Sequence, residues 1–244
     1  MKIRIKFRKY GVMKFIGHLD IMRYFQKAMR RAEIDICYSG GYSPHQIMSF
    51  AAPLGVGVTS DGEYMDIEVN SSLSTKEAIN ALNATMVEGM EIVDYVKLPD
   101  SAKTAMSIVA AADYELFFKD GYEPPVSVEE FALGLHRFFM EPTEVLLVKQ
   151  TKKGEKTIDL KQLVYIFSVE SKEGRPSFFL RLSTGSTDNL KPELVVGALF
   201  DAMGYSYDSN AIQIHRKELY AASADGYIAL GELGEKLFEG ESEA

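Results

Sequence analysis

The chain has 244 residues, 46% of them hydrophobic, and a formal net charge of −8 at pH 7. This length allows two domains of roughly 100 residues, each with its own core. The single cysteine, Cys37, excludes an internal disulfide framework and a cysteine-based zinc site within one chain. No apolar run approaches the ~20 residues that span a bilayer, and the alternating N-terminus is not typical of a signal peptide. We therefore expect a cytoplasmic protein that makes no membrane contact.

The first hundred residues predict alternating strands and helices. Period-two patterns predict strands over residues 2–8, 63–69 and 90–97. A helical pattern covers residues 19–32, and Ser74 to Glu77 is a capping box that opens a second helix. With a short strand near residues 49–58, the order of elements is β-α-β-β-α-β.

The second half repeats this order as a pattern, without residue-level identity to the first. Strands are predicted over residues 114–119, 145–150, 177–183 and 211–216. A second capping box, Ser127 to Glu130, opens one helix, and Pro192 lies in the first turn of another. An extra segment, residues 156–170, interrupts this copy. We predict an α+β protein with two tandem ferredoxin-like (β-α-β-β-α-β) domains with antiparallel sheets, at residues 1–107 and 108–217, and an acidic C-terminal tail at 218–244.

Positive charge is concentrated near the N-terminus. Residues 1–50 hold ten Lys or Arg and three acids, a net charge of +7, which leaves −15 for the remaining residues. The basic side of the predicted helix continues the cations of the first strand, and such a surface could meet several phosphates at once. A solvated helix face is the plainer interpretation. The basic residues predicted to bind a ligand are Arg8, Lys9, Arg23, Lys27, Arg30 and Arg31.

A glycine-rich loop with aromatic residues follows the basic helix. Residues 38–45 read Tyr-Ser-Gly-Gly-Tyr-Ser-Pro-His. Glycines allow backbone amides to approach an anion, and aromatic rings stack on bases. A rigid surface turn is the alternative. From this loop, the residues predicted to bind a ligand are Tyr38, Tyr42, Ser43 and His45.

Three residues are candidates for catalysis: His18, Asp20 and His45. An imidazole titrates near neutrality, and a neighbouring carboxylate can fix its tautomer. The alternative for Asp20 is a favourable charge in the first turn of the helix, and His18 could be a partly buried structural group. Nothing in the spacing fixes a metal geometry, and no Gly-x-Ser-x-Gly elbow is present, so we predict no metal and no cofactor.

At these residues the chain resembles the radical-SAM-linked proteins, an uncharacterised bacterial family also called DUF2344. The matching motifs are Phe-Ile-Gly-His-Leu-Asp-Ile-Met-Arg (15–23), Tyr-Ser-Gly-Gly-Tyr-Ser-Pro-His (38–45), Ser-Phe-Ala-Ala-Pro-Leu-Gly-Val-Gly (49–57), Leu-Arg-Leu-Ser-Thr-Gly-Ser (180–186) and Asn-Leu-Lys-Pro (189–192). The family pattern has Ser at the position of Gly17 and Pro-Lys at Gln46-Ile47, so this chain lacks a lysine after His45. The resemblance implies a radical-SAM enzyme as partner, and the Cys-x3-Cys-x2-Cys motif for its cluster is absent here.

Three functions remain open. The first is an accessory module that binds RNA or another phosphate-rich ligand and works with a radical-SAM enzyme, in RNA modification. The second is a metal-independent endoribonuclease that uses His18 or His45, resembling the tandem ferredoxin-like CRISPR repeat-processing nucleases. The third is a protein-interaction domain without nucleic acid. The first is expected, which makes the chain itself non-catalytic.

Overall fold

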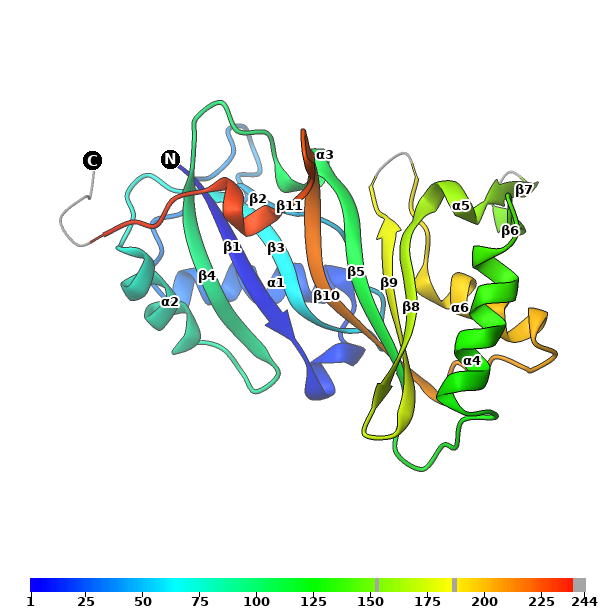
Figure 1. Cartoon of the computed structure of the whole chain (residues 1–244). Helices are drawn as coiled ribbons and strands as arrows, with labels where there is room; N and C mark the ends of the chain where they lie inside the picture. The colour runs from blue at the N-terminus through cyan, green and yellow to red at the C-terminus, as the bar shows by residue number, and fades with distance from the viewer. Residues whose placement is uncertain (152–153, 186–187, 239–244) are drawn as a thin grey trace. The chain divides into compact units, whose positions relative to one another are not determined.

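The computed structural model describes residues 1–151, 154–185 and 188–238 (Figure 1). They form a mixed α+β fold whose strands pair mostly antiparallel. The chain divides into two compact units. Unit 1 contains Met1–Ala111 and the chain from Glu218 onward, and unit 2 contains Ala112–Lys217. In the described ranges no helix is both long and apolar enough to cross a membrane.

Unit 1 is built on an antiparallel sheet in which β1 lies between β4 and β3. The short strand β2 pairs with β3, the part of β10 from Glu218 onward follows β3 in the strand order, and β11 pairs with β10. The strands are β1 (Lys2–Lys9), β2 (Met48–Phe50), β3 (Thr59–Glu68), β4 (Met90–Leu98), β10 (Ile212–Ser223) and β11 (Gly226–Ala229). The helical segments are η1 (Gly11–Phe15), α1 (His18–Arg31), α2 (Thr75–Asn83), α3 (Ala105–Ile108) and η3 (Leu230–Leu233).

The core of unit 1 lies between this sheet and the helices α1 and α2. Ile3, Ile5 and Phe7 point from β1 to this side, because alternate residues of a strand face opposite sides of a sheet. The apolar residues of α1, including Phe25 and Met29, recur at helical spacing and pack against them. The even-numbered residues of β1 face the other side, where η3 lies (Figure 1). The capping box predicted at the start of α2 is confirmed.

Unit 2 has the strand order β10-β5-β9-β8, in which β8 and β9 pair antiparallel. Phe118, Phe131, Phe178 and Phe200 form its aromatic core. The capping box predicted at the start of α4 is also confirmed. The elements are β5 (Val109–Phe118), α4 (Val128–Leu135), η2 (His136–Met140), β6 (Leu146–Thr151), β7 (Gly154–Asp159), α5 (Leu160–Leu163), β8 (Val164–Lys172), β9 (Arg175–Ser183) and α6 (Pro192–Ala202).

One predicted strand of unit 2 lies outside the strand order β10-β5-β9-β8. The strand predicted at 145–150 exists as β6, but it pairs with β7 in a separate two-stranded sheet. The neighbour of β9 is instead β8, which lies mostly inside the segment 156–170 that was expected to interrupt the domain. The pattern of β8 is irregular because a bulge lies between Val164 and Ile166. Whether the units are tandem ferredoxin-like domains stays a prediction.

Residues 218–244 were expected to form an acidic tail, but the described part of this segment, residues 218–238, is folded as part of unit 1. Residues 218–223 complete β10, and β11 and η3 follow. Leu230 and Leu237 are buried. The backbones of Lys97 and Glu235 exchange two hydrogen bonds of 2.8 and 2.9 Å. Two apolar anchors and this backbone pairing hold an acidic segment against unit 1, although its composition is typical of a solvated tail.

Candidate functional site

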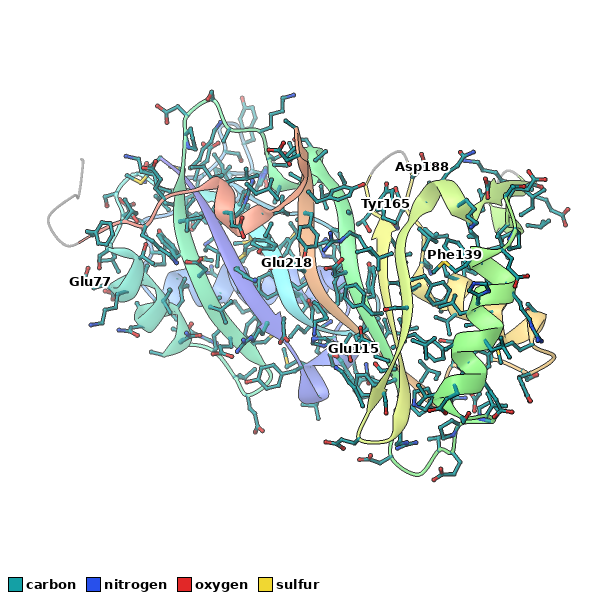
Figure 2. The ribbon with its side chains drawn as sticks, viewed as in Figure 1. Glu77, Glu115, Phe139, Tyr165, Asp188 and Glu218 are labelled. Atoms are coloured by element: carbon teal, nitrogen blue, oxygen red, sulfur yellow. The ribbon has the colours of Figure 1, made fainter. Side chains whose placement is uncertain are left out.

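The basic residues of β1 are engaged by partners within unit 1. Arg4 is 1% exposed and binds Asp66 through two hydrogen bonds of 2.8 and 3.0 Å. A third bond, of 3.1 Å, reaches the backbone oxygen of Leu230. The Nζ of Lys6 lies 2.5 Å from a carboxylate oxygen of Glu218, a residue labelled in Figure 2. Buried charges need such partners, so these cations belong to the structure of unit 1.

Glu218 also affects a buried phenol. Burial raises the pKa of Tyr64, and the charge of Glu218 together with its hydrogen bond to the phenol raises it further. The phenol therefore stays protonated at neutral pH. The first residue of the segment expected as a tail is thus part of a partly buried polar cluster with Lys6 and Tyr64.

Arg8 and Lys9, both predicted to bind a ligand, lie on opposite faces of the sheet. Arg8 forms ion pairs with Asp61 at 3.4 Å and Glu91 at 3.2 Å. Lys9 is 2% exposed, and its ammonium donates a hydrogen bond of 2.7 Å to the backbone oxygen of Ile16. Arg8 is neutralised locally and Lys9 is buried, so neither adds an uncommitted cation to the surface.

The cations of α1 have a different environment. Arg23, Lys27, Arg30 and Arg31 are all exposed. Arg23 pairs with Asp20 at 3.2 Å, and both side chains are about two-thirds exposed, at 68% and 66%. Within the described residues, the side chains of Lys27, Arg30 and Arg31 form no hydrogen bond or ion pair. Three cations on one helix are therefore available to an anion.

The loop from Cys37 to Ile47 is closed at its base like a hairpin. The backbone of Ile47 donates to Cys37 at 2.9 Å, and that of Ser39 donates to His45 at 2.8 Å. At the tip, Gly41 adopts a φ of +95°, a conformation that favours glycine. Tyr42 is fully exposed. The base is thus fixed while the tip presents a tyrosine ring to solvent.

This loop is attached directly to α1. The side-chain amide of Gln46 donates to the backbone oxygen of Gln26 at 3.2 Å. Arg23 lies three residues before Gln26 and Arg30 four residues after it, so both are neighbours of Gln26 on the helix surface. We define the α1–loop surface as the following exposed residues: Arg23, Lys27, Arg30, Arg31, Tyr38, Tyr42, Ser43 and His45.

The imidazole of His45 is oriented by a serine. Its Nδ1 lies 2.9 Å from the Ser39 hydroxyl oxygen, which also accepts the backbone N–H of His45 at 3.1 Å. In the tautomer in which the hydroxyl donates to Nδ1, the proton of the ring is on Nε2. His45 is exposed, so the α1–loop surface includes one imidazole with a defined orientation.

His18 occupies a separate environment. Its ring meets Phe50 edge to face, with centroids 5.2 Å apart. It lines a recess of about 20 Å³ together with the buried residues Lys9 and Glu63, a volume that holds about one water molecule. Asp20 binds Arg23, and within the described residues no hydrogen bond or ring contact joins His18 to Asp20 or to His45. The three candidate catalytic residues are therefore not linked by direct contacts in this part of the chain, and their catalytic role stays a prediction.

Metal ligands do not gather at either histidine. Over the described ranges, no group of three or more His, Cys, Asp or Glu side chains could hold a metal ion. The recess offers one imidazole, one carboxylate and one ammonium group. These three groups can hold a water molecule or move a proton, but the recess is too small to admit a nucleotide.

Sequence analysis missed the carboxylates that partner β1. Asp66 lies opposite Arg4 across the β1–β3 pair, and Glu68 lies opposite Lys2. The acids of β3 were a signal for these pairs, because opposite charges are favourable across a strand pair. Using that signal requires the register of the two strands, which the sequence does not give.

Unit 2 contains a second charged cluster that sequence analysis missed. Glu115, labelled in Figure 2, is contacted by Lys172, by Lys217 at 3.6 Å and by the Ser177 hydroxyl at 2.9 Å. Burial opposes ionisation of Glu115, but the hydrogen bonds of Lys172 and Ser177 and the two lysine charges outweigh it, so the pKa of Glu115 is lowered. Glu115 is therefore ionised at neutral pH.

Comparisons with known proteins identify a family without a known activity. A search of curated proteins finds no match. One family model, described as an uncharacterised protein conserved in bacteria, matches residues 2–192. The match covers the α1–loop surface and most of unit 2, so this chain belongs to the DUF2344 family.

Proposed function

We propose that the α1–loop surface binds the phosphate backbone of RNA and that the chain is an accessory protein of a radical-SAM enzyme. The observation that carries the RNA proposal is the contrast in pairing: Lys27, Arg30 and Arg31 have no side-chain partner within the described residues, whereas the cations of β1 are paired. Cations without protein partners can neutralise phosphates and release their counterions, which drives RNA binding.

Aromatic residues beside these cations favour single-stranded RNA. Tyr42 is fully exposed and Tyr38 is about half exposed. Exposed rings next to positive charge are typical of surfaces on which unpaired bases stack while the backbone follows the cations. His45 and Ser43 add hydrogen-bonding groups to the same loop.

The radical-SAM part of the proposal rests on the resemblance to radical-SAM-linked proteins. The chain has one cysteine and cannot hold the cluster itself, so the radical chemistry would belong to the partner. RNA modification suits this division, because the accessory protein would supply the substrate. We test this part by copurifying the tagged chain from its native host. Mass spectrometry should identify a radical-SAM enzyme, and its absence would contradict the partnership.

We also propose that both units are ferredoxin-like. In unit 1 the strand order β4-β1-β3, with β2 beside β3, supports this fold. In unit 2 the order β10-β5-β9-β8 supports it, with β6, β7 and α5 as an insertion. An experimental structure with a different strand order in either unit would contradict the proposal.

RNA binding is tested by reversing the cations that lack partners. The triple variant Lys27→Glu/Arg30→Glu/Arg31→Glu is compared with Lys76→Glu/Lys103→Glu/Lys191→Glu, which changes the net charge equally at exposed positions outside α1. Fluorescence anisotropy with a labelled single-stranded RNA measures affinity at several salt concentrations. The slope of log affinity against log salt concentration should be smaller in magnitude by about 2 in the α1 variant than in the wild type. This difference corresponds to roughly 0.7 for each of the three lost phosphate contacts. Equal loss in the control variant would overturn the proposal.

The same samples test the endoribonuclease alternative. RNA incubated with the wild-type chain is sequenced at its ends, with and without divalent metal. We expect intact RNA, because within the described residues no hydrogen bond or ring contact joins His18 to His45 as a pair of acid and base. Specific cleavage that is lost in His45→Ala or His18→Ala would replace the accessory function with nuclease activity.

A further inference from the structure

Unit 2 contains a cavity of about 610 Å³ that none of the preceding functions uses. It lies where β5 ends, at the turn between β8 and β9 and beside the start of β10. Its volume is in the range of small-molecule sites, about 300–1,000 Å³. Glu173 and Gly174 have φ values of +52° and +77°, the left-handed conformation of both central residues in a two-residue hairpin turn. The rim at this turn is therefore a tight, defined structure.

Cations from three parts of unit 2 line this cavity. They are Lys119, which directly follows β5, Lys172 at the end of β8, and Arg175 at the start of β9. Three acids also line the cavity. One of them, Glu115, is buried and is already contacted by Lys172, Lys217 and Ser177. The other two acids, Asp120 and Glu173, are exposed. Lys172 is exposed like these two acids, so the less exposed part of the lining holds Lys119 and Arg175 against Glu115, which suits an anionic ligand. The ammonium of Lys119 also donates a hydrogen bond of 2.8 Å to the backbone oxygen of Asn210.

Arg175 is held in place and has an unsatisfied nitrogen. One terminal nitrogen of its guanidinium donates to the backbone oxygens of Tyr122 and Lys119. Its Nε is buried and has no hydrogen-bond partner in the described part of the chain. A buried donor without an acceptor is uncommon and calls for a partner such as a bound ion, water or ligand.

An aromatic wall completes the site. Phe117, near the end of β5, is 36% exposed, and both Phe117 and Gln213 line the cavity. A flat apolar ring next to cations and an amide can hold a planar group that carries a phosphate. A simple inorganic anion would leave this ring unused.

We propose that this cavity binds a nucleoside monophosphate, with the phosphate near Lys119 and Arg175 and the base against Phe117. The nucleotide has two possible sources: a free mononucleotide or the 5′-phosphorylated end of an RNA chain. The site uses none of the residues of the α1–loop surface, so the proposal of nucleotide binding does not depend on the proposed function.

Titration calorimetry of the full-length chain with AMP, GMP, CMP and UMP tests the site. At least one nucleotide should bind. Phe117→Ala and Lys119→Ala should each weaken binding by about tenfold, the loss expected for one base stack or one charged contact. Leu133→Ala and Lys191→Ala, at exposed positions outside the cavity lining, should bind as the wild type does. Melting curves verify that each variant is folded.

Additional ligands distinguish the two parts of the nucleotide and its source. The matching nucleoside should bind about tenfold more weakly than the monophosphate. The α1 triple variant should bind the nucleotide as tightly as the wild type does. If this variant also binds 5′-phosphorylated RNA more tightly than 5′-hydroxyl RNA, the RNA end is the source of the nucleotide. Free nucleotide binding without that preference would identify a small molecule. Any of three results would overturn the proposal. Inorganic phosphate could bind as tightly as the nucleotide, Phe117→Ala and Lys119→Ala could leave the affinity unchanged, or none of these probes could bind.

Discussion

Strand β1 and helix α1 carry similar numbers of cations and use them differently. On β1, Arg4 is buried against Asp66, Lys6 meets Glu218, and Arg8 has two acidic neighbours. On α1, Lys27, Arg30 and Arg31 are exposed and unpaired within the described residues. Both sets lie in one N-terminal cluster of the sequence. The difference shows that local charge density does not identify a binding surface until the partners of each cation are known.

The largest effect is expected at Arg4. Arg4→Ala leaves Asp66 buried without its cation and the Leu230 oxygen without its donor, which should lower the free energy of unfolding by about 3–5 kcal/mol. Urea unfolding followed by circular dichroism measures this loss. Arg31→Ala on α1 is the matched control and should change stability by less than about 0.5 kcal/mol. Similar losses at both positions would remove the contrast between strand and helix.

Lys6 should have an intermediate effect. Its side chain is 25% exposed and that of Glu218 15% exposed, so Lys6→Ala should cost about 1–2 kcal/mol, as expected for a hydrogen bond between charged groups. A double-mutant cycle with Glu218→Ala isolates the pair. Additive effects of the two substitutions would show that the contact contributes no coupling energy, and β1 would then be less tightly tied to the end of the chain than the structure indicates.

Arg8 tests the boundary between the two sets. It is half exposed like a surface cation but has acidic neighbours like the rest of β1. Arg8→Ala should therefore lower stability by at most about 1 kcal/mol and leave RNA affinity nearly unchanged. Anisotropy titrations beside Arg30→Ala measure the second quantity. An equal loss of affinity in the two variants would extend the binding surface onto β1.

The smallest effect is expected at Lys27, and its sign is opposite to the others. Arg23 and Arg31 lie four residues on either side of Lys27, and like charges at this spacing destabilise a helix by about 0.2–0.5 kcal/mol per pair. Lys27→Gln should therefore raise the melting temperature slightly while it weakens RNA binding. Lower stability in this variant would indicate that Lys27 has a structural role that the pairing pattern does not show.

Local sequence patterns predicted several elements of both units well. The apolar spacing of α1 and the capping boxes of Ser74 and Ser127 depend only on residues within a turn or two of one another. Strand β8 was missed because its bulge breaks the alternation and several of its residues are exposed. The C-terminal segment was missed because the burial of Leu219, Leu230 and Leu237 depends on strands that are distant in sequence, whereas the local composition is rich in acids.

The candidate site was predictable in part for the same physical reason. The exposure of Arg23, Lys27, Arg30 and Arg31 follows from the helical period of α1 alone. The burial of Lys9 and the different contacts of His18 and His45 depend on how strands and loops pack. The cavity of unit 2 joins residues from Glu115 to Gln213, and no local pattern brings these together.

The return of the chain to unit 1 has a consequence for protein synthesis. Residues 1–111 leave the ribosome first, but Glu218 and Leu230, which contact Lys6 and Arg4, follow only after the whole of unit 2. At about 5–20 residues per second, the delay is on the order of 5–20 s. Unit 2 is continuous in sequence and can complete its structure first. Unit 1 can therefore be completed only after all of unit 2 has been synthesised.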